Sequence, residues 1–387
     1  MYFFMLATVA ATLPAIIMRL FHIQIDPRLD SIVFGVGILG AAFLLSWAAE
    51  IAQIDIPKGL ALAILALIAI LPEYAVDLYF AWVAAYEPAY ASYATANMTG
   101  ANRLLVGCGW PFIVLLFCLS FRSGKVQLTS NNRAEISYLA IATLYAFTIP
   151  VKGSLNVIDF LILSTIFVCY VRRTALMEIH EPELVGPAKL LGQLSQKKRR
   201  YTNVGLFLFS GFAIFCSAEP FAEGLINSGK LLGIDEYFLV QWLAPLASEA
   251  PELIIAALWS LRGQPAAAMT ALISSKVNQW TLLVGTIPAV YSISGGAINA
   301  MVLDTRQQHE ILLTAAQSAF AVVVLMNLSI SVREAIVLLS IFIAQLIYPD
   351  IRVQVSVLYI ALALILIFRR KKDILPLLRY GLLNKES

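Results

Sequence analysis

Long apolar runs separated by short polar breaks set the organisation of this 387-residue chain. Each run holds about 18 residues or more, which is the length that an α-helix needs to cross a bilayer. One longer polar stretch, residues 172–203, divides the runs into six and six. The pattern predicts spans at 2–21, 31–52, 58–86, 92–121, 133–150, 154–171, 204–229, 236–261, 265–293, 308–327, 331–348 and 352–368.

Composition agrees with a protein that lives in a bilayer. Hydrophobic residues make up 60% of the chain and charged residues 13%, whereas a soluble domain carries about 25% charged residues. The ten-residue alternation typical of membrane β-strands is not present in the sequence. We therefore predict an all-α polytopic membrane protein with about 12 transmembrane helices, whose partner is the lipid bilayer and not nucleic acid.

The distribution of basic residues predicts an orientation. If both termini and the 172–203 stretch are cytoplasmic, 19 of the 27 lysines and arginines face the cytoplasm and 6 face outward. Cytoplasmic loops of membrane proteins carry such an excess of positive charge. This bias predicts an even number of spans and an integral protein of the plasma (inner) membrane with both termini inside.

The two halves repeat one order of features. A span with Pro-Glu at its centre (Pro72-Glu73, Pro251-Glu252) precedes a span that ends in Leu-Leu-Val-Gly (104–107, 282–285). The two Pro-Glu spans run in opposite directions, so we predict two inverted-topology repeats around a midplane site. The predicted segments are an extra N-terminal helix (1–30), the first repeat (31–171, with its α-repeat at 58–121), a cytoplasmic loop (172–203), the second repeat (204–348, with its α-repeat at 236–293), and an extra helix with a basic tail (349–387).

Carboxylates at the centres of the Pro-Glu spans are the first candidate site residues. Proline removes a helical hydrogen bond, so we expect Pro72 and Pro251 to break or kink their helices at the midplane. Glu73 and Glu252 would then lie in the first turn of a half-helix. Asp77 and Glu249 lie one turn away, and the four could supply hard oxygen ligands to one cation. The alternative is that these acids pair with intramembrane bases and serve packing.

The span that follows each Pro-Glu span adds polar side chains. Such residues could complete a cation site, or they could hold membrane helices together without binding an ion. The candidates are Asn97, Thr99 and Asn102 in the first copy, and Ser274, Ser275, Asn278 and Gln279 in the second.

The stretches AILPE with NMTGAN, and LASEAPE with SSKVNQ, resemble the two α-repeats of the sodium/calcium exchanger superfamily, the cation/calcium antiporters. The resemblance implies ten core helices, with spans 2–21 and 352–368 as additions. It also implies that Glu73 and Glu252 are the ion-binding glutamates. Asn97 and Asn102 match the first two asparagines of the motif, and Ser275 matches the serine of the second repeat.

The chain also departs from that pattern. Apolar Ile68-Ala69-Ile70 replaces Gly-Thr-Ser before the first Pro-Glu, and Glu249 stands where a serine is usual. Two fixed cations, Arg103 and Lys276, lie near the centres of their spans. A charge at that depth is costly and normally faces an opposite charge. We expect the four acids above to be their charge partners.

These features predict a secondary active antiporter that exchanges Ca²⁺ or another cation for Na⁺. An H⁺-coupled exchanger is the alternative, because Glu219 and Glu223 bring the intramembrane acids to six, and six ionised carboxylates are implausible at that depth. A third hypothesis is a non-transporting membrane protein in which Arg103 and Lys276 neutralise a dead site. We expect no enzyme activity, no catalytic residues and no cofactor, only transported cations that bind transiently.

Overall fold

The computed structural model describes residues 2–23, 25–55, 71–177 and 184–383, which are mostly helical. The helices of the first half are α1 (Tyr2–Leu20), α2 (Pro27–Asp55), α4 (Leu71–Ala84), α5 (Tyr90–Leu104), the π-helix η1 (Leu105–Gly109), α6 (Trp110–Phe121), α7 (Asn132–Ala146), α8 (Thr148–Lys152) and α9 (Val157–Thr174). Those of the second half are α10 (Gly186–Gly192), α11 (Gln196–Leu232), α12 (Glu236–Leu261), α13 (Pro265–Asn278), the π-helix η2 (Gln279–Leu283), α14 (Val284–Ser294), α15 (Thr305–Leu325), α16 (Val332–Ile347), the short 3-10 helix η3 (Pro349–Ile351), α17 (Arg352–Arg369) and α18 (Lys371–Leu383).

Each predicted span is mainly helical where the structure describes it, although some ends differ: Ser154–Leu155 and Ser331, for example, lie in short strands. Within the described residues, seven helical segments are long and apolar enough to cross a membrane by length and composition. The first part of the predicted 58–86 span, and with it the predicted break before Pro72, lies outside the described residues. Two short helices were not predicted: α10 in the 172–203 stretch and α18 in the basic tail.

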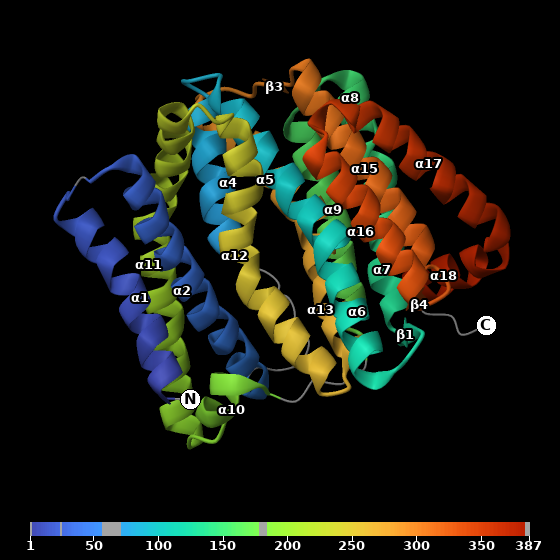
Figure 1. Cartoon of the computed structure of the whole chain (residues 1–387), viewed down its shortest axis with the longest axis horizontal. Coiled ribbons are helices and arrows are strands. Elements are labelled where there is room, and N and C mark those ends of the chain that lie inside the picture. The colour runs from blue at the N-terminus through green and yellow to red at the C-terminus, as the bar shows by residue number, and fades with distance from the viewer. Residues whose placement is uncertain (1, 24, 56–70, 178–183, 384–387) are drawn as a thin grey trace.

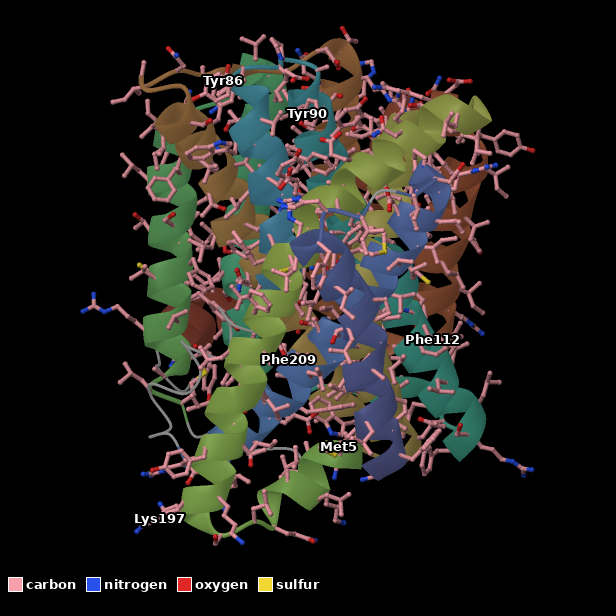
Figure 2. The ribbon with its side chains drawn as sticks, turned by 90° about the vertical axis from the view of Figure 1, so that its left-hand side faces the viewer. Met5, Tyr86, Tyr90, Phe112, Lys197 and Phe209 are labelled. Atoms are coloured by element: carbon pink, nitrogen blue, oxygen red, sulfur yellow. The ribbon has the colours of Figure 1, made fainter. Side chains whose placement is uncertain are left out.

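Three helices, α1, α2 and α11, pack side by side along one edge of the bundle (Figure 1). Ion pairs join them at different levels: Arg19 of α1 pairs with Glu219 of α11, and Arg199 Nε of α11 lies 2.7 Å from Asp55 Oδ2 of α2. Lys197 and Tyr86 lie at opposite ends of the molecule (Figure 2). The remaining helices form the larger part of the bundle.

Helix α12 carries the second Pro-Glu pair, and the predicted break at Pro251 is wrong. The helix runs without interruption from Glu236 to Leu261 through both Pro245 and Pro251, although Figure 1 shows it changing direction along its length. Proline is tolerated inside membrane helices where neighbouring groups satisfy the backbone that it frees. Between the two prolines, the Ser248 hydroxyl donates to the carbonyls of Ala244 (3.3 Å) and Pro245 (3.2 Å).

Helices α5 and α12 cross closely because α5 has a glycine at the crossing. Pro245 has no N–H for the carbonyl of Gln241 four residues earlier, and that carbonyl faces Gly100. A Cβ atom added at Gly100 would lie 1.8 Å from the Gln241 oxygen. The absence of a side chain therefore sets the distance between the two helices that carry most of the candidate site.

Two short antiparallel strand pairs close the ends of the α7–α15 helix pair. Strand β1 (Lys125–Gln127) pairs with β4 (Ser329–Ser331), and β2 (Ser154–Leu155) pairs with β3 (Met301–Val302). Strand β1 precedes α7 and β4 follows α15, whereas β2 follows α8 and β3 precedes α15. Each pair thus joins a segment of the first half to a segment of the second.

Substitution of Gly100 by alanine is expected to destabilise the protein, because the new methyl group overlaps the Gln241 carbonyl. Overpacking of this kind costs about 1–3 kcal/mol, and thermal unfolding in detergent would show a lower midpoint. Gly205→Ala in α11 is the matched control, since nothing lies within 4 Å of its added Cβ. Equal midpoints for the two variants would contradict this account of the α5–α12 crossing.

Candidate ion-binding site

One amide joins carboxylates from the two halves of the chain. Gln279 Nε2 donates to Glu73 Oε2 and to Glu249 Oε1, each at 2.9 Å. The three residues come from α4, α12 and η2, and each is at most 3% exposed. Glu73 Oε1 and Glu249 Oε2 have no hydrogen-bond partner among the described residues. We call Glu73 and Glu249 the carboxylate pair.

Glu252 lies one turn beyond Glu249 on α12 and completes the group. Its carboxyl interacts electrostatically with both members of the carboxylate pair. The hydroxyl of Ser275, from α13, lies beside it. The structure therefore brings together the two glutamates and the serine that the motifs single out.

A second polar contact lies one turn along α4 from Glu73. Asn97 Nδ2 of α5 donates to Asp77 Oδ1 at 2.9 Å, and both residues are almost completely buried. Asp77 Oδ2 and Asn97 Oδ1 have no hydrogen-bond partner within the described parts of the chain. Asp77 also interacts electrostatically with Glu73, so this contact belongs to the same buried centre.

Asn278 is linked to the buried centre through Tyr74, a residue that was not predicted from the sequence. The Tyr74 hydroxyl donates to Asn278 Oδ1 at 3.0 Å. Tyr74 follows Glu73 directly, so the same turn of α4 contacts both α13 and η2 in the second half. The sequence carried a signal for it, because a tyrosine next to a buried glutamate is a buried hydroxyl that needs an acceptor.

Lys276 binds an amide instead of a carboxylate, which corrects one expectation. Its ammonium lies 2.6 Å from Asn102 Oδ1, and its Nζ is 4.5 Å from the centroid of the Trp280 ring. Lys276 and Asn102 are both completely buried. Glu249 and Glu73 act on the ammonium only at longer range, without a direct ion pair.

The expected partners of Arg103 were also wrong. Arg103 lies 2.6 Å from Glu310 Oε2 of α15 and donates to Gln345 Oε1 of α16 at 2.6 Å. Arg352 of α17 contacts the other oxygen of the same carboxylate at 2.6 Å. Sequence reasoning missed Glu310, although an acid and a base at the starts of the predicted spans 308–327 and 352–368 were a usable signal.

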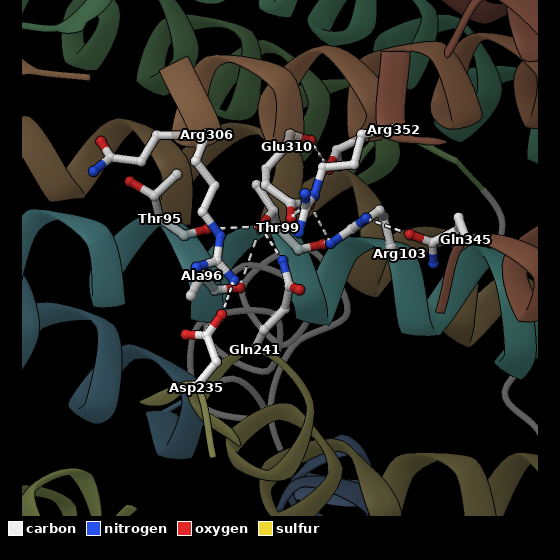
Figure 3. Close-up of polar contacts among 12 residues, drawn as sticks. Thr95, Ala96, Thr99, Arg103, Asp235, Gln241, Arg306, Glu310, Gln345 and Arg352 are labelled. Atoms are coloured by element: carbon white, nitrogen blue, oxygen red, sulfur yellow. Dashed lines mark hydrogen bonds and ion pairs between the residues drawn. The ribbon is translucent and has the colours of Figure 1, made fainter. Parts of the chain in front are cut away.

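A cavity of about 610 Å³ lies next to this ion-pair network (Figure 3). Arginines reach it from three helices, and we call it the arginine cavity. It is lined by Arg103, Ile234, Asp235, Phe238, Gln241, Trp242, Thr305, Arg306, His309, Glu310, Gln345, Leu346, Pro349, Asp350 and Arg352.

The remaining two intramembrane acids are engaged elsewhere. Glu219 pairs with Arg19. Glu223 Oε1 accepts hydrogen bonds from the hydroxyls of Tyr79 at 2.7 Å and Tyr90 at 2.6 Å. The buried centre therefore contains four of the six acids that the sequence suggested: Glu73, Asp77, Glu249 and Glu252.

The chemistry of this centre suits a hard cation, although its donors are spread out in this conformation. Carboxylate and amide oxygens are the ligands that Ca²⁺ and Na⁺ accept. Among the described residues, no three His, Cys, Asp or Glu side chains lie close enough together to hold a metal ion. The oxygens of the carboxylate pair are instead separated by the Gln279 amide.

A helical bundle with carboxylates, amides and one lysine buried at its centre defines an integral membrane protein with a polar interior. The model of the sodium/calcium exchanger protein family matches residues 31–174 and 202–349. The chain therefore belongs to the sodium/calcium exchanger family.

Solved structures agree with this assignment. The chain is 46% identical to a protein described as the H⁺/Ca²⁺ exchanger CAX, with a TM-score of 0.95 over 98% of this chain and 97% of that one. It shares the fold of YfkE (17% identity, TM-score 0.61, 89% and 98% covered) and of the sodium-calcium exchanger NCX_Mj (14% identity, TM-score 0.56, 83% and 98% covered). A comparison with curated protein sequences finds no match.

Replacing Asn102 by leucine is expected to destabilise the protein by leaving the Lys276 ammonium without its amide partner. A hydrogen bond to a charged group contributes about 1.5–3 kcal/mol, so the thermal unfolding midpoint should fall, although the backbone carbonyl of residue 102 still accepts from Lys276. The double variant Asn102→Leu/Lys276→Met removes the charge as well and should recover most of the loss. If the single and double variants unfold at the same temperature, Asn102 does not stabilise the lysine.

Proposed function

We propose that this protein is a secondary active antiporter that exchanges a divalent cation, Ca²⁺, for protons. The observation that carries the proposal is the carboxylate pair, in which two buried acids share one neutral amide. Two carboxylates in a medium of low dielectric cannot both stay ionised without a positive charge beside them. Either a cation or protons must supply that charge. The 46% identity to an H⁺/Ca²⁺ exchanger supports the same pair of ions.

Exchange follows from competition for the same oxygens. When they are protonated, Glu73 and Glu249 each accept a hydrogen bond from Gln279 and do not bind a cation. A cation that enters the centre draws in the oxygens that have no partner, including those of Asp77 and Asn97, and displaces the protons. Because one set of oxygens serves both ions, a proton-loaded and a cation-loaded centre exclude each other.

Matched features in the two halves support the predicted inverted repeats, and with them alternating access around the centre. The third span of each copy contains a π-helix, η1 or η2, at or beside its Leu-Leu-Val-Gly. Capping boxes begin α9 (Asn156 with Asp159) and α16 (Ser331 with Glu334), directly after β2 and β4. We propose that the protein lies in the plasma (inner) membrane with twelve spans and with both termini on the cytoplasmic side.

Sodium is the second candidate for the driving ion. The family model is named for sodium/calcium exchange, and carboxylate and amide oxygens bind Na⁺ as they bind Ca²⁺. Two departures from the family pattern argue against sodium. Apolar Ile68-Ala69-Ile70 offers no hydroxyl ligand in the first copy, and in the second copy an acid that can carry a proton, Glu249, stands where a serine is usual.

Purified protein in liposomes separates the two driving ions. An imposed pH gradient, acidic inside, should drive Ca²⁺ uptake in sodium-free buffer, because protons that bind the carboxylates from the inside are released outside in exchange for the Ca²⁺ that enters. An outward Na⁺ gradient at equal pH should not. Radioactive ⁴⁵Ca²⁺ in the vesicles is the readout, and protein-free liposomes are the control. Uptake driven only by the Na⁺ gradient would identify sodium, and not the proton, as the driving ion. If neither gradient drives uptake, the antiporter proposal fails.

Neutralising the central glutamates tests the site itself. Glu73→Gln and Glu252→Gln should each lower gradient-driven ⁴⁵Ca²⁺ uptake by about 100-fold or more, since each removes a carboxylate whose interaction with a divalent ion is worth several kcal/mol at short range. Glu219→Gln is the matched control, because Glu219 pairs with Arg19 outside the centre. If Glu73→Gln and Glu252→Gln transport Ca²⁺ as well as Glu219→Gln does, the buried centre is not the transport site.

A further inference from the structure

Helix α5 links the arginine cavity to the buried centre through two consecutive residues. Arg103 lines the cavity, and Asn102 holds the ammonium of Lys276. The buried end of the cavity therefore lies next to the centre along α5. The cavity is separate from α1, α2 and α11, which do not line it.

The buried end of the cavity carries a net positive charge. Arg103 and Glu310 are at most 2% exposed at their side chains, and Arg352 is 17% exposed. Two guanidinium groups thus share one carboxylate, and guanidinium stays charged at any physiological pH. The rim has the opposite balance, with Asp235, Asp350 and Arg306.

Arg103 is held in place on several sides. It pairs with Glu310 and Gln345, and its Nε donates to the Thr99 carbonyl at 3.4 Å. Its guanidinium also lies 5.1 Å from the centroid of the Trp242 ring. Figure 3 shows the group between α5 and the helices that carry Glu310 and Gln345. A charge fixed in this way cannot swing aside to let a cation pass.

Without the Arg103 guanidinium, the same place would lose its net positive charge. The Glu310 carboxylate would keep only Arg352 as its ion-pair partner, at 2.6 Å, and the Gln345 amide oxygen and the Thr99 carbonyl would each lose a donor. Gln241 extends the polar lining, since its Nε2 lies 3.3 Å from the Thr99 hydroxyl. Carboxylate and carbonyl oxygens are suitable ligands for Ca²⁺ and Na⁺. Since Arg352 balances the charge of Glu310, Arg103 supplies the net positive charge that opposes a cation here.

We propose that Arg103 determines the specificity of exchange by closing the arginine cavity to cations, so that cations reach the carboxylates only by the exchange route. This inference rests on the antiport proposed above. Arg103 does not bind the transported cation. It prevents Ca²⁺ from crossing without a counter-moving proton.

The test measures how many protons move for each Ca²⁺. Proteoliposomes receive ⁴⁵Ca²⁺ outside and a pH-sensitive dye inside, at low buffering capacity and without sodium. In the wild type, the ratio of Ca²⁺ to counter-moving H⁺ should stay constant as the pH gradient varies. Arg103→Gln should add a Ca²⁺ flux without matching protons, about 100-fold above the wild-type leak, as expected for removing a unit charge a few ångströms from the path.

Three variants separate charge from structure. Arg103→Lys keeps the charge and should keep the wild-type ratio. Arg306→Gln is the matched control, because Arg306 lines the same cavity but pairs with Asp235, and it should also keep the ratio. Arg103→Met retains an apolar stem and should leak like Arg103→Gln, which covers the case in which Arg103→Gln does not fold.

The outcomes are distinct. A constant ratio in folded Arg103→Gln or Arg103→Met overturns the role of Arg103 and leaves the antiport intact. A leak in Arg103→Lys equal to that in Arg103→Gln also overturns it, because packing and not charge would then matter. A wild type that moves no Ca²⁺ under a pH gradient refutes the proton-coupled antiport, and the inference fails with it.

Discussion

Burial of carboxylates in a medium of low dielectric is the constraint on which the interior of this protein depends. An ionised group there needs a partner, and each partner must be supplied by another helix. Gln279 meets the need for Glu73 and Glu249 with two hydrogens of one amide. Because that amide is neutral, it leaves the charge of the pair uncompensated. In the proposed exchange, protons or a cation would supply the missing positive charge.

The two buried bases serve different purposes because their partners differ. Lys276 binds the oxygen of Asn102 and the face of Trp280 and leaves the nearby carboxylates free for other ions. Arg103 is committed to Glu310, away from the centre. A direct ion pair between either base and Glu73 or Glu249 would occupy the oxygens that a transported ion needs. Keeping the bases on other partners therefore preserves the site.

The sequence predicted the helical spans and several contacts of the site because hydrophobic runs and matched motifs are local signals. The repeat singled out Glu73 and Glu252, and the resemblance singled out Ser275; in the structure the Ser275 hydroxyl lies beside Glu252. The sequence prediction failed where a long-range partner decided the outcome. Pro251 does not end α12, which continues to Leu261. Arg103 binds Glu310, more than 200 residues away. Gln279 joins one helix of the first half, α4, to one of the second, α12. Sequence spacing encodes neither contact.

The strand pairs at the ends of α7 and α15 have a mechanical consequence. Strand register is fixed in whole residues, and a slip of one residue would turn every side chain to the opposite face and break the ladder. With β1 joined to β4 at one end and β2 joined to β3 at the other, α7 cannot slide along α15. The α7–α15 pair is therefore expected to move as one rigid unit. In the proposed exchange, any movement that changes access to the centre would involve helices that are not joined by strand pairs at both ends.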